Sequence, residues 1–517
     1  MAALWSIAGQ WLVFALNFAV SVVIARYLLP PSALGTFSVG FAAAAMISTL
    51  QDFGLSRFLV RSEHLTDQML DTCTTITLCV GAAICAVIAS LSVPVAWYYA
   101  NPQLTPIMLL IAAGFLLLPF NTVPIALLQR EVNYRTISVI NLAGAAANGG
   151  VSVLFAFWGY GAVSLAVGFL AQQIARAAAA ELLGPRSIRF KFSFKGARPV
   201  ISFGSGTTVL AVSGALGTRS PDLIIGSALG MHAVGLFGRA SGMADGVRVL
   251  LDGGISSVFF SHFAQLVRAK RKLDRAYLDL VACYTSIMWP AMLLLSLLSR
   301  PIVTIVYGQG WAEAADALRW LALSELVFFA LPLHTEVPLL SGHLKALLVR
   351  NILDTAAALV CLLCFVRFGL AAAAGARIVY AAIWFAIYFG LMQRITGFSP
   401  RALFGTLSSS AACTLAACLP VVALSRGGEV LTPGIALASV VSGGSLWLLA
   451  VALLRHPTWR EIAGVLNGIR RSLPGRKPTD SDNRAAVREE ERRAAPTPPS
   501  PQSASRYDDD FRERNIG

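Results

Sequence analysis

Charged side chains interrupt an otherwise apolar stretch of this sequence at Arg219 and Asp222. Because they lie three residues apart, a helix would place both side chains on one face. A guanidinium can bind two phosphate oxygens at once, whereas a neighbouring carboxylate would neutralise it as an ion pair. Pro221, between them, removes a backbone hydrogen bond from such a helix. The two residues are therefore candidates for binding an anionic substrate, with a structural ion pair in a kinked helix as the alternative.

Two further arginines lie in apolar stretches, Arg239 and Arg176. Arg239 is close to the start of its stretch, where a long side chain could instead reach the polar surface. Several arginines lining one cavity would favour an anionic cargo, and a diphosphate over a cationic drug. The predicted substrate-binding residues are Arg219, Asp222, Arg239 and Arg176.

A second group of titratable residues occurs between positions 316 and 340 and contains Glu325, His334 and Glu336. Carboxylate and imidazole side chains inside a membrane can carry a proton or coordinate a cation. These three residues are therefore candidates for coupling transport to H⁺ or Na⁺. A buried hydrogen-bonding role is the alternative for each of them.

The elements that must position these residues are apolar segments of membrane-spanning length. The chain is 56% hydrophobic and only 13% charged, whereas soluble domains usually contain about 25% charged residues. Backbone amides find no water in a hydrocarbon core, so spans of about 20 apolar residues must be helices. The sequence thus predicts an all-α, polytopic membrane protein with about fourteen transmembrane helices. They are expected near residues 4–26, 33–52, 73–97, 105–128, 137–157, 161–182, 200–226, 233–256, 277–298, 316–340, 347–366, 370–391, 402–424 and 432–454.

Lys and Arg are concentrated in alternate loops, including the segments 186–198 and 268–275. Basic loops stay on the cytoplasmic side, and an even number of spans leaves both termini there. The same bias explains much of the net charge of +14, so that charge requires no nucleic-acid partner. The eight cysteines all lie in apolar stretches, and we interpret the Cys361 and Cys364 pair as packed small side chains rather than a metal site.

The second half of the chain repeats features of the first at a constant offset. Leu29, Ala33, Gly35 and Phe37 recur as Leu229, Ala233, Gly235 and Phe237, and Asp52, Gly54 and Ser56 recur as Asp252, Gly254 and Ser256. A repeat of six spans is parallel, and proteins built this way commonly move two lobes about a central site. We expect an N-terminal lobe at 1–198, a C-terminal lobe at 199–394, two further spans at 395–455 and a cytoplasmic, mostly disordered tail at 456–517.

Short motifs in the first 455 residues or so resemble the polysaccharide flippases of the multidrug/oligosaccharidyl-lipid/polysaccharide exporter superfamily. The motifs are Arg26–Gly35, Asp52–Leu55, Ala126–Glu131, Arg219–Gly226, Leu236–Ala240 and Val306–Trp311. Arg219 and Asp222 are similar to the Arg-x-x-Asp of the family's seventh span, and Arg239 is similar to its arginine near the start of the eighth. Ser220 and Pro221 differ from the Asn-rich spacing of that motif.

The resemblance implies a protein of the bacterial inner membrane. Such a protein moves undecaprenyl-diphosphate-linked oligosaccharide repeat units across the membrane for exopolysaccharide or lipopolysaccharide biosynthesis. The implied mechanism is alternating access driven by a cation gradient or the membrane potential. Membrane lipids, a polysaccharide polymerase and export machinery are the partners expected of it.

Two other functions are compatible with the sequence. A cation-coupled drug antiporter of the same superfamily would favour acidic residues in the cavity. A membrane-integral polysaccharide polymerase or glycosyltransferase would require a large outer loop or a catalytic domain, and the loops between the predicted spans are short. Neither a glycine-rich phosphate loop nor a metal-ligand motif is present in the sequence. We therefore predict that the protein is not an enzyme and needs no cofactor or metal.

Overall fold

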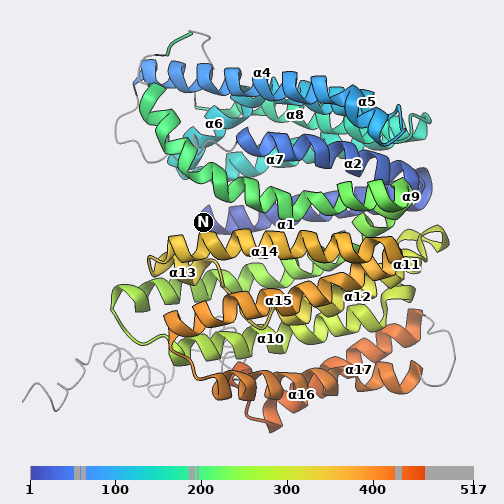
Figure 1. Ribbon diagram of the computed structural model, residues 1–517, viewed down its shortest axis with the longest axis vertical. Coiled ribbons are helices and arrows are strands. Elements are labelled where there is room, and N and C mark those ends of the chain that lie inside the picture. Colours follow the sequence, from blue (N-terminus) through green and yellow to red (C-terminus); the bar gives the residue numbers. More distant parts are fainter. Residues whose placement is uncertain are drawn as a thin grey trace, which may run out of the picture. The chain divides into compact units, whose positions relative to one another are not determined.

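The computed structural model describes residues 2–51, 59, 66–185, 192–194, 197–425 and 433–459, and every regular element in these ranges is a helix (Figure 1). The all-α prediction is therefore confirmed. The chain divides into two units, Met1–Thr458 and Trp459–Gly517. The predicted tail, apart from its first four residues, lies outside the described residues.

The helices follow the predicted spans closely. The first half of the chain forms α1 (Ala2–Val23), α2 (Pro31–Ser48), α4 (Asp67–Tyr98), α5 (Leu104–Phe115), α6 (Leu118–Arg130), α7 (Tyr134–Phe157) and α8 (Val163–Leu183). The second half forms α9 (Ala197–Arg268), α10 (Asp274–Leu297), α11 (Ser299–Tyr307), α12 (Ala314–Phe328), α13 (Glu336–Leu340), α14 (Leu344–Phe365), α15 (Leu370–Thr396), α16 (Pro400–Ser425) and α17 (Pro433–Leu453).

Local sequence signals explain several helix ends. The hydroxyl of Thr66 accepts a hydrogen bond from the amide of Met69 and caps α4, and the amide oxygen of Asn133 accepts one from Thr136 and caps α7. Pro31 occupies the first position of α2, where a missing N–H costs nothing. Gly397 takes a left-handed conformation, with φ of 79°, and ends α15.

Eleven helices in the described ranges are long and apolar enough to cross a membrane, or twelve if the bent pair α5 and α6 is one span. Two features explain why the number of candidate spans is lower than the fourteen predicted. The predicted spans 200–226 and 233–256 lie within one element, α9. Its backbone departs from helical geometry at Gly230, where φ is 83°. The predicted span 316–340 is divided between α12, of 15 residues, and the short α13. The number fourteen stays a prediction.

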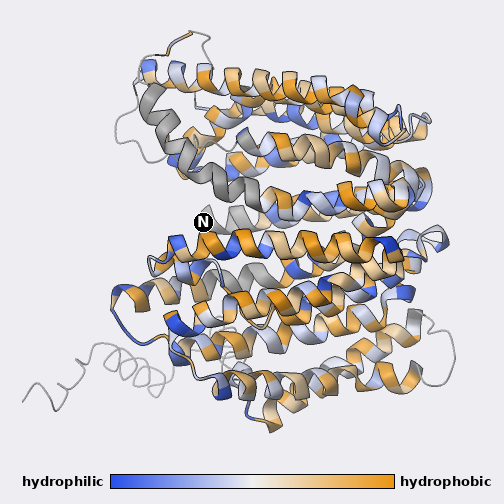
Figure 2. Ribbon diagram, viewed as in Figure 1, coloured by the Kyte–Doolittle hydropathy of each residue, from blue (hydrophilic) through white to orange (hydrophobic). Residues whose placement is uncertain are grey.

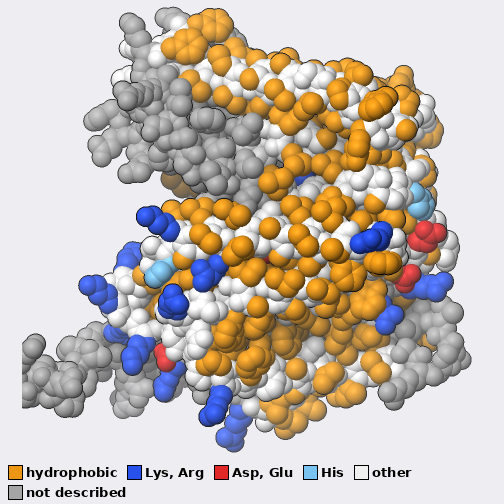
Figure 3. All heavy atoms as spheres, viewed as in Figure 1, with side chains coloured by type: hydrophobic (Ala, Val, Ile, Leu, Met, Phe, Trp, Pro, Cys, Tyr) orange, Lys and Arg blue, Asp and Glu red, His pale blue; other side chains and the backbone are white. Residues whose placement is uncertain are grey.

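The surface of the helices fits a lipid environment. Hydrophobic residues run along most of each helix, and hydrophilic residues lie at many helix ends and at scattered positions within the helices (Figure 2). On the face shown in Figure 3, hydrophobic side chains cover α14 and α15, and Lys and Arg gather at the left end. Exposed basic residues at the starts of α10, α14 and α16 include Lys272, Lys345 and Arg401. This is a multi-pass membrane protein with a strong excess of positive charge at one end of its second half.

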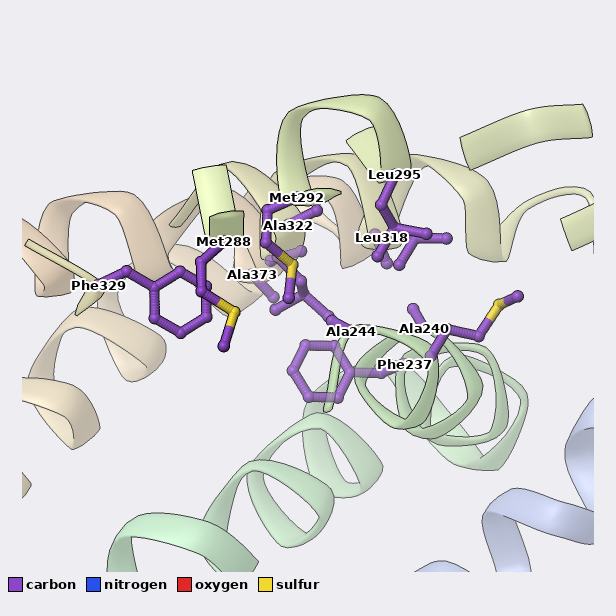
Figure 4. Packing of buried hydrophobic residues seen from close by; sticks show 14 of the residues in the cluster. Phe237, Ala240, Ala244, Met288, Met292, Leu295, Leu318, Ala322, Phe329 and Ala373 are labelled. Atoms are coloured by element: carbon purple, nitrogen blue, oxygen red, sulfur yellow. The ribbon is translucent and has the colours of Figure 1, made fainter. Parts of the chain in front are cut away.

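Each half has its own helix packing, and the two halves meet chiefly where α2 packs along α9. In the first half α7 packs against α1 and α8, and in the second half α10 packs against α12 and α16. The second half of α9 contributes a face of mixed small and large residues to the core (Figure 4). Buried residues there include Phe237, Ala240 and Ala244 of α9, Met288, Met292 and Leu295 of α10, and Leu318 and Ala322 of α12.

The residues after α17 fold back onto the helices. His456 is 2% exposed, and its ring nitrogens lie 3.2 Å from the Ser410 hydroxyl and 2.9 Å from the Thr458 hydroxyl. The Thr458 hydroxyl lies 2.7 Å from that of Ser286 on α10. These contacts belong to the first unit, which extends to Thr458. The predicted boundaries of the lobes and of the tail stay predictions.

Candidate functional site

The two halves of the chain approach most closely at a pair of glycines related by the sequence repeat. A Cβ atom added to Gly35 of α2 would lie 1.7 Å from the carbonyl oxygen of Met231, and one added to Gly235 of α9 would lie 1.9 Å from that of Pro31. Pro31 and Met231 are themselves separated by the offset of the repeat. The contact is thus reciprocal, and it brings backbone against backbone because neither glycine has a side chain.

Hydrogen bonds between the halves surround this glycine contact. The indole N–H of Trp311 donates to the Ala25 carbonyl at 2.8 Å, and the Tyr99 hydroxyl donates to the Leu223 carbonyl at 2.9 Å. The Arg26 guanidinium also donates to the Ile305 carbonyl. We call the contacts of α1, the short helical segment Ile24–Leu28, α2 and Tyr99 with α9, α11 and Trp311 the seam. α11, one of the elements of the seam, lies at the right-hand end of the helices in Figure 1.

Arg219 and Asp222 lie on the first half of α9 beside the seam. The Arg219 guanidinium carbon is 5.2 Å from the centroid of the Phe41 ring of α2, which is a cation–π distance. Within the described part of the chain, no ion pair of 4 Å or less joins Arg219 to Asp222 or to any other carboxylate. The arginine therefore contacts the other half of the protein without a close ion pair, and Asp222 acts on it through a longer-range electrostatic interaction.

Arg239 lies on the second half of α9 and also faces the first half. Its guanidinium donates to the Ser21 hydroxyl of α1 and lies 5.9 Å from the centroid of the Tyr307 ring of α11. Arg239 is half-buried. These contacts hold its head group in the seam, so the structure does not favour the alternative in which it reaches the outer surface.

Arg176 lies apart from the other arginines, between α8 and α7 in the first half. A Cβ atom added to Gly144 of α7 would lie 2.4 Å from Arg176 Cγ, so the aliphatic part of this arginine crosses the bare backbone of that glycine. Its Nε atom is buried without a hydrogen-bond partner. The structure does not bring Arg176 into contact with Arg219 or Arg239 among the interactions of the described residues.

The predicted coupling residue Glu325 of α12 is paired with a basic residue. Its Oε1 atom lies 2.5 Å from the Arg377 guanidinium of α15, and the Glu325 side chain is 4% exposed. The same guanidinium lies 5.2 Å from the Phe328 ring centroid. The second carboxylate oxygen of Glu325 is buried without a partner. If Glu325 binds a proton or a cation, that binding must therefore compete with its ion pair to Arg377.

The other two coupling candidates lie in the link between α12 and α13 and at its end. His334 packs edge-on against Trp384 and Tyr388 of α15, with ring centroids 4.8 and 4.9 Å away. Glu336 accepts a hydrogen bond of 2.8 Å from the Thr335 hydroxyl and interacts electrostatically with His334. Among residues that the structure describes, no group of three His, Cys, Asp or Glu side chains could hold a metal ion.

The ion pair makes a testable contribution to stability. An Arg377→Leu variant leaves the Glu325 carboxylate buried without its partner, and we expect it to lose about 3 kcal/mol of stability. Removing both charges, as Glu325→Gln with Arg377→Leu, should restore most of that loss. The temperature of half-unfolding in detergent measures both effects. Equal stability of the single and double variants would show that Glu325 does not depend on Arg377.

Several residues of the seam escaped the sequence-based prediction. Phe41, Ser21 and Tyr307 are partners of the two α9 arginines, yet nothing in an apolar segment marks them individually. Gly35 and Gly235 were visible only as members of the repeat, which indicated related positions but not contact. The seam therefore includes two arginines of α9, one on each side of the break at Gly230, and both contact the first half of the chain. Guanidinium groups at such positions can bind an anion.

The chain is similar in sequence and in fold to several known proteins. A family model described as "Polysaccharide biosynthesis protein" matches residues 23–316. The lipopolysaccharide biosynthesis protein WzxC of Escherichia coli K12 is 24% identical over 326 residues, which are 62% of this chain and 66% of that protein. The teichuronic acid biosynthesis protein TuaB of Bacillus subtilis is 20% identical over 53% of this chain and 57% of its own length. The alignments thus span somewhat less than two thirds of these relatives.

Solved structures share the fold at low sequence identity. The lipid II flippase MurJ in an inward closed conformation superposes with a TM-score of 0.73 at 12% identity, over 89% of this chain and all of MurJ. A multidrug resistance MATE family transporter of the MOP superfamily in an inward-facing conformation gives 0.60 at 15% identity, over 74% of this chain and 95% of that protein. At such identities the likeness concerns the fold alone.

Proposed function

The chain belongs to the polysaccharide biosynthesis protein family, and from this premise we propose that it translocates undecaprenyl-diphosphate-linked oligosaccharide repeat units across the bacterial inner membrane. The product would serve lipopolysaccharide or exopolysaccharide biosynthesis. This substrate has a hydrophilic sugar, an anionic diphosphate and an apolar tail. The protein must shelter the first two while the tail stays in lipid, and no covalent bond needs to be broken.

The observation that supports this proposal most directly is the state of the arginines at membrane depth. Arg176, Arg219 and Arg239 lie within candidate spans, and none pairs with a carboxylate within the part of the chain that the structure describes. A charged side chain at the bilayer centre costs about 2.5–3.5 kcal/mol. Binding an anion during the transport cycle would offset this cost for an unpaired arginine. A diphosphate has the oxygen atoms that guanidinium groups bind.

Arg219 and Arg239 are the residues we propose to bind the cargo first, because they face the opposite half of the protein across the seam. Asp222 lies one turn beyond Arg219 and interacts with it electrostatically, although no ion pair of 4 Å or less joins them in the described part of the chain. We propose that Asp222 weakens anion binding enough to permit release. Arg176, in the first half, would contact the same cargo from the other side.

The closed end suggests how access alternates. The reciprocal glycine contact and the hydrogen bonds around it seal one end of the seam. Release on that side requires these contacts to separate, with the two halves tilting about the opposite end. We propose that the sealed end faces away from the cytoplasm, because the exposed basic residues of the second half gather at the other end of the helices. Both termini would then be cytoplasmic.

Coupling to H⁺ or Na⁺ is proposed to involve Glu325, His334 and Glu336. Glu325 combines a buried oxygen without a partner and a guanidinium partner, so protonation or cation binding would compete with Arg377. Because Arg377 belongs to α15, such competition would alter the contact between α12 and α15. A polysaccharide polymerase and export machinery are proposed partners that would consume the translocated unit.

A cation-coupled drug antiporter is the second candidate, favoured by the structural likeness to a MATE family transporter. Cationic drugs would be repelled by Arg219 and Arg239, whereas lipid-linked diphosphates would be attracted. A membrane-integral polymerase or glycosyltransferase has less support, since no described segment outside the helices is large enough for a catalytic domain.

Reconstitution tests the proposal directly. The purified protein in liposomes should expose undecaprenyl-diphosphate-linked oligosaccharide of the inner leaflet to an added sugar-modifying enzyme, at a rate that depends on the protein. Liposomes containing the protein and a cationic drug should show no uptake. Drug uptake without movement of the lipid-linked sugar would favour the antiporter.

A further inference from the structure

α7 and α8 are joined by a line of small and polar residues, here called the ladder, that ends at Arg176. Three facing positions follow one another at four-residue intervals on both helices: Gly144 with Arg176, Asn148 with Gln172, and Ser152 with Gly168. A four-residue interval keeps side chains on one helix face. The ladder is therefore a continuous line of small and polar residues between two apolar helices.

Each step of the ladder is a close contact. The Asn148 amide N–H donates to the Gln172 side-chain oxygen at 2.9 Å, and the Ser152 hydroxyl donates to the Asn148 side-chain oxygen at 3.1 Å. Hydrogen bonds between polar side chains fix the register of neighbouring helices in a membrane. The register set by Asn148 and Gln172 places Gly144 directly beside Arg176.

Gly144 is the position at which a side chain would conflict with the arginine. Its missing Cβ would lie 2.4 Å from Arg176 Cγ, 2.9 Å from Arg176 Cδ and 3.4 Å from Gln172 Cγ. The buried Nε of Arg176 has no partner, and a buried donor without a partner costs about 1–3 kcal/mol. Such a donor is explained if a ligand oxygen satisfies it during part of the cycle.

We propose that Gly144 is a positioning residue for transport, with the Asn148–Gln172 hydrogen bond as its support. The bare backbone of Gly144 fixes the aliphatic part of Arg176 and thereby aims its guanidinium at a phosphate oxygen of the cargo. This inference rests on the proposed function for the identity of the cargo. It adds that the α7 and α8 register, and not the presence of the arginine alone, decides whether the diphosphate is bound.

The test compares two glycines of the same helix. Gly144→Ala should lower the rate of lipid-linked oligosaccharide translocation by about 10-fold or more, since a misplacement of about 1 Å can cost about 100-fold. Gly150→Ala is the matched control, because nothing lies within 4 Å of its added Cβ. Both changes raise helix propensity equally, so that contribution cancels.

A double-variant cycle separates positioning from packing. In an Arg176→Ala background, Gly144→Ala should cost no more than about twofold, because the group that it displaces is absent. If Gly144 only maintained helix packing, its effect would persist there. If Gly144→Ala does not fold, Gln172→Ala takes its place and is compared with and without Arg176→Ala. Gln172→Ala removes the hydrogen bond to Asn148. Equal behaviour of Gly144→Ala and Gly150→Ala, or multiplicative losses in the cycle, would overturn the proposal.

A binding measurement keeps this inference separate from the proposed function. Undecaprenyl diphosphate without sugar serves as the probe, and its affinity for the detergent-purified protein is measured by calorimetry. Gly144→Ala and Arg176→Ala should weaken the binding to the same extent, and Gly150→Ala should leave it unchanged. If that pattern holds while translocation is absent, the function fails and the positioning role stands. If translocation occurs and Gly144→Ala binds the probe normally, the positioning role fails.

Discussion

An Arg219→Ala variant should lose translocation of lipid-linked oligosaccharide by a factor of about 100 or more. The guanidinium faces the opposite half of the protein over Phe41 and has no carboxylate partner within the described residues. Two hydrogen bonds from a charged group to phosphate contribute about 1.5–3 kcal/mol each, and about 1.36 kcal/mol changes a rate tenfold. In cells, the variant should accumulate lipid-linked repeat units on the inner leaflet and make little polymer.

Arg367→Ala is the matched control for this loss. The Arg367 guanidinium also lies over a phenylalanine, 5.6 Å from the Phe368 ring centroid, but Phe368 is 71% exposed, and no contact of Arg367 with the first half of the chain is present among the described residues. Its replacement should leave translocation unchanged. Arg219→Lys should retain part of the activity, because lysine keeps the charge and loses the planar fork. Normal polymer output from Arg219→Ala would remove this residue from the mechanism.

Asp222→Asn distinguishes cargo binding from the alternative of a structural ion pair. Because no ion pair of 4 Å or less joins Arg219 and Asp222, the Asn variant should lose far less activity than Arg219→Ala. If the two residues depended on each other, the two substitutions would be equally harmful.

Gly235→Ala should disrupt the sealed end of the seam and strongly impair the transport cycle. The added methyl would lie 1.9 Å from the Pro31 carbonyl oxygen, and backbone cannot move aside as a flexible side chain can. Overpacking costs about 1–3 kcal/mol, which changes the ratio of sealed to open states by about 5- to 150-fold. Gly35→Ala should behave alike, since its methyl would meet the Met231 carbonyl oxygen at 1.7 Å.

Gly242→Ala is the matched control. It makes the same substitution in α9, but no atom lies within 4 Å of the added Cβ. A Val39→Cys reporter measures opening, since Val39 is fully buried against Gly226 of α9. A membrane-impermeant maleimide should label this cysteine in the Gly235→Ala protein and not in the Gly242→Ala protein. Labelling at the same low rate in both would show that the glycine contact does not hold this end closed.

The resemblance to polysaccharide flippases is confirmed at the level of the family, and the positions of most helices agree with the predicted spans. The predicted site residues do not all lie together in the structure. Arg219, Asp222 and Arg239 lie beside the seam, whereas Arg176 lies within the first half and Glu325 is neutralised by Arg377. Whether these residues bind cargo or a coupling ion stays a prediction.

The sequence by itself determined the all-helical fold, because length and hydrophobicity of a segment decide whether its backbone can be satisfied in lipid. It also revealed the repeat, since Gly35 and Gly235 have equivalent neighbours along the chain. Only the tertiary structure decided which charges have partners. Arg377 meets Glu325, and Arg239 meets Ser21, across long separations in sequence. A helix apolar on every face does not reveal which side meets lipid and which meets protein, because lipid tails are as apolar as leucine.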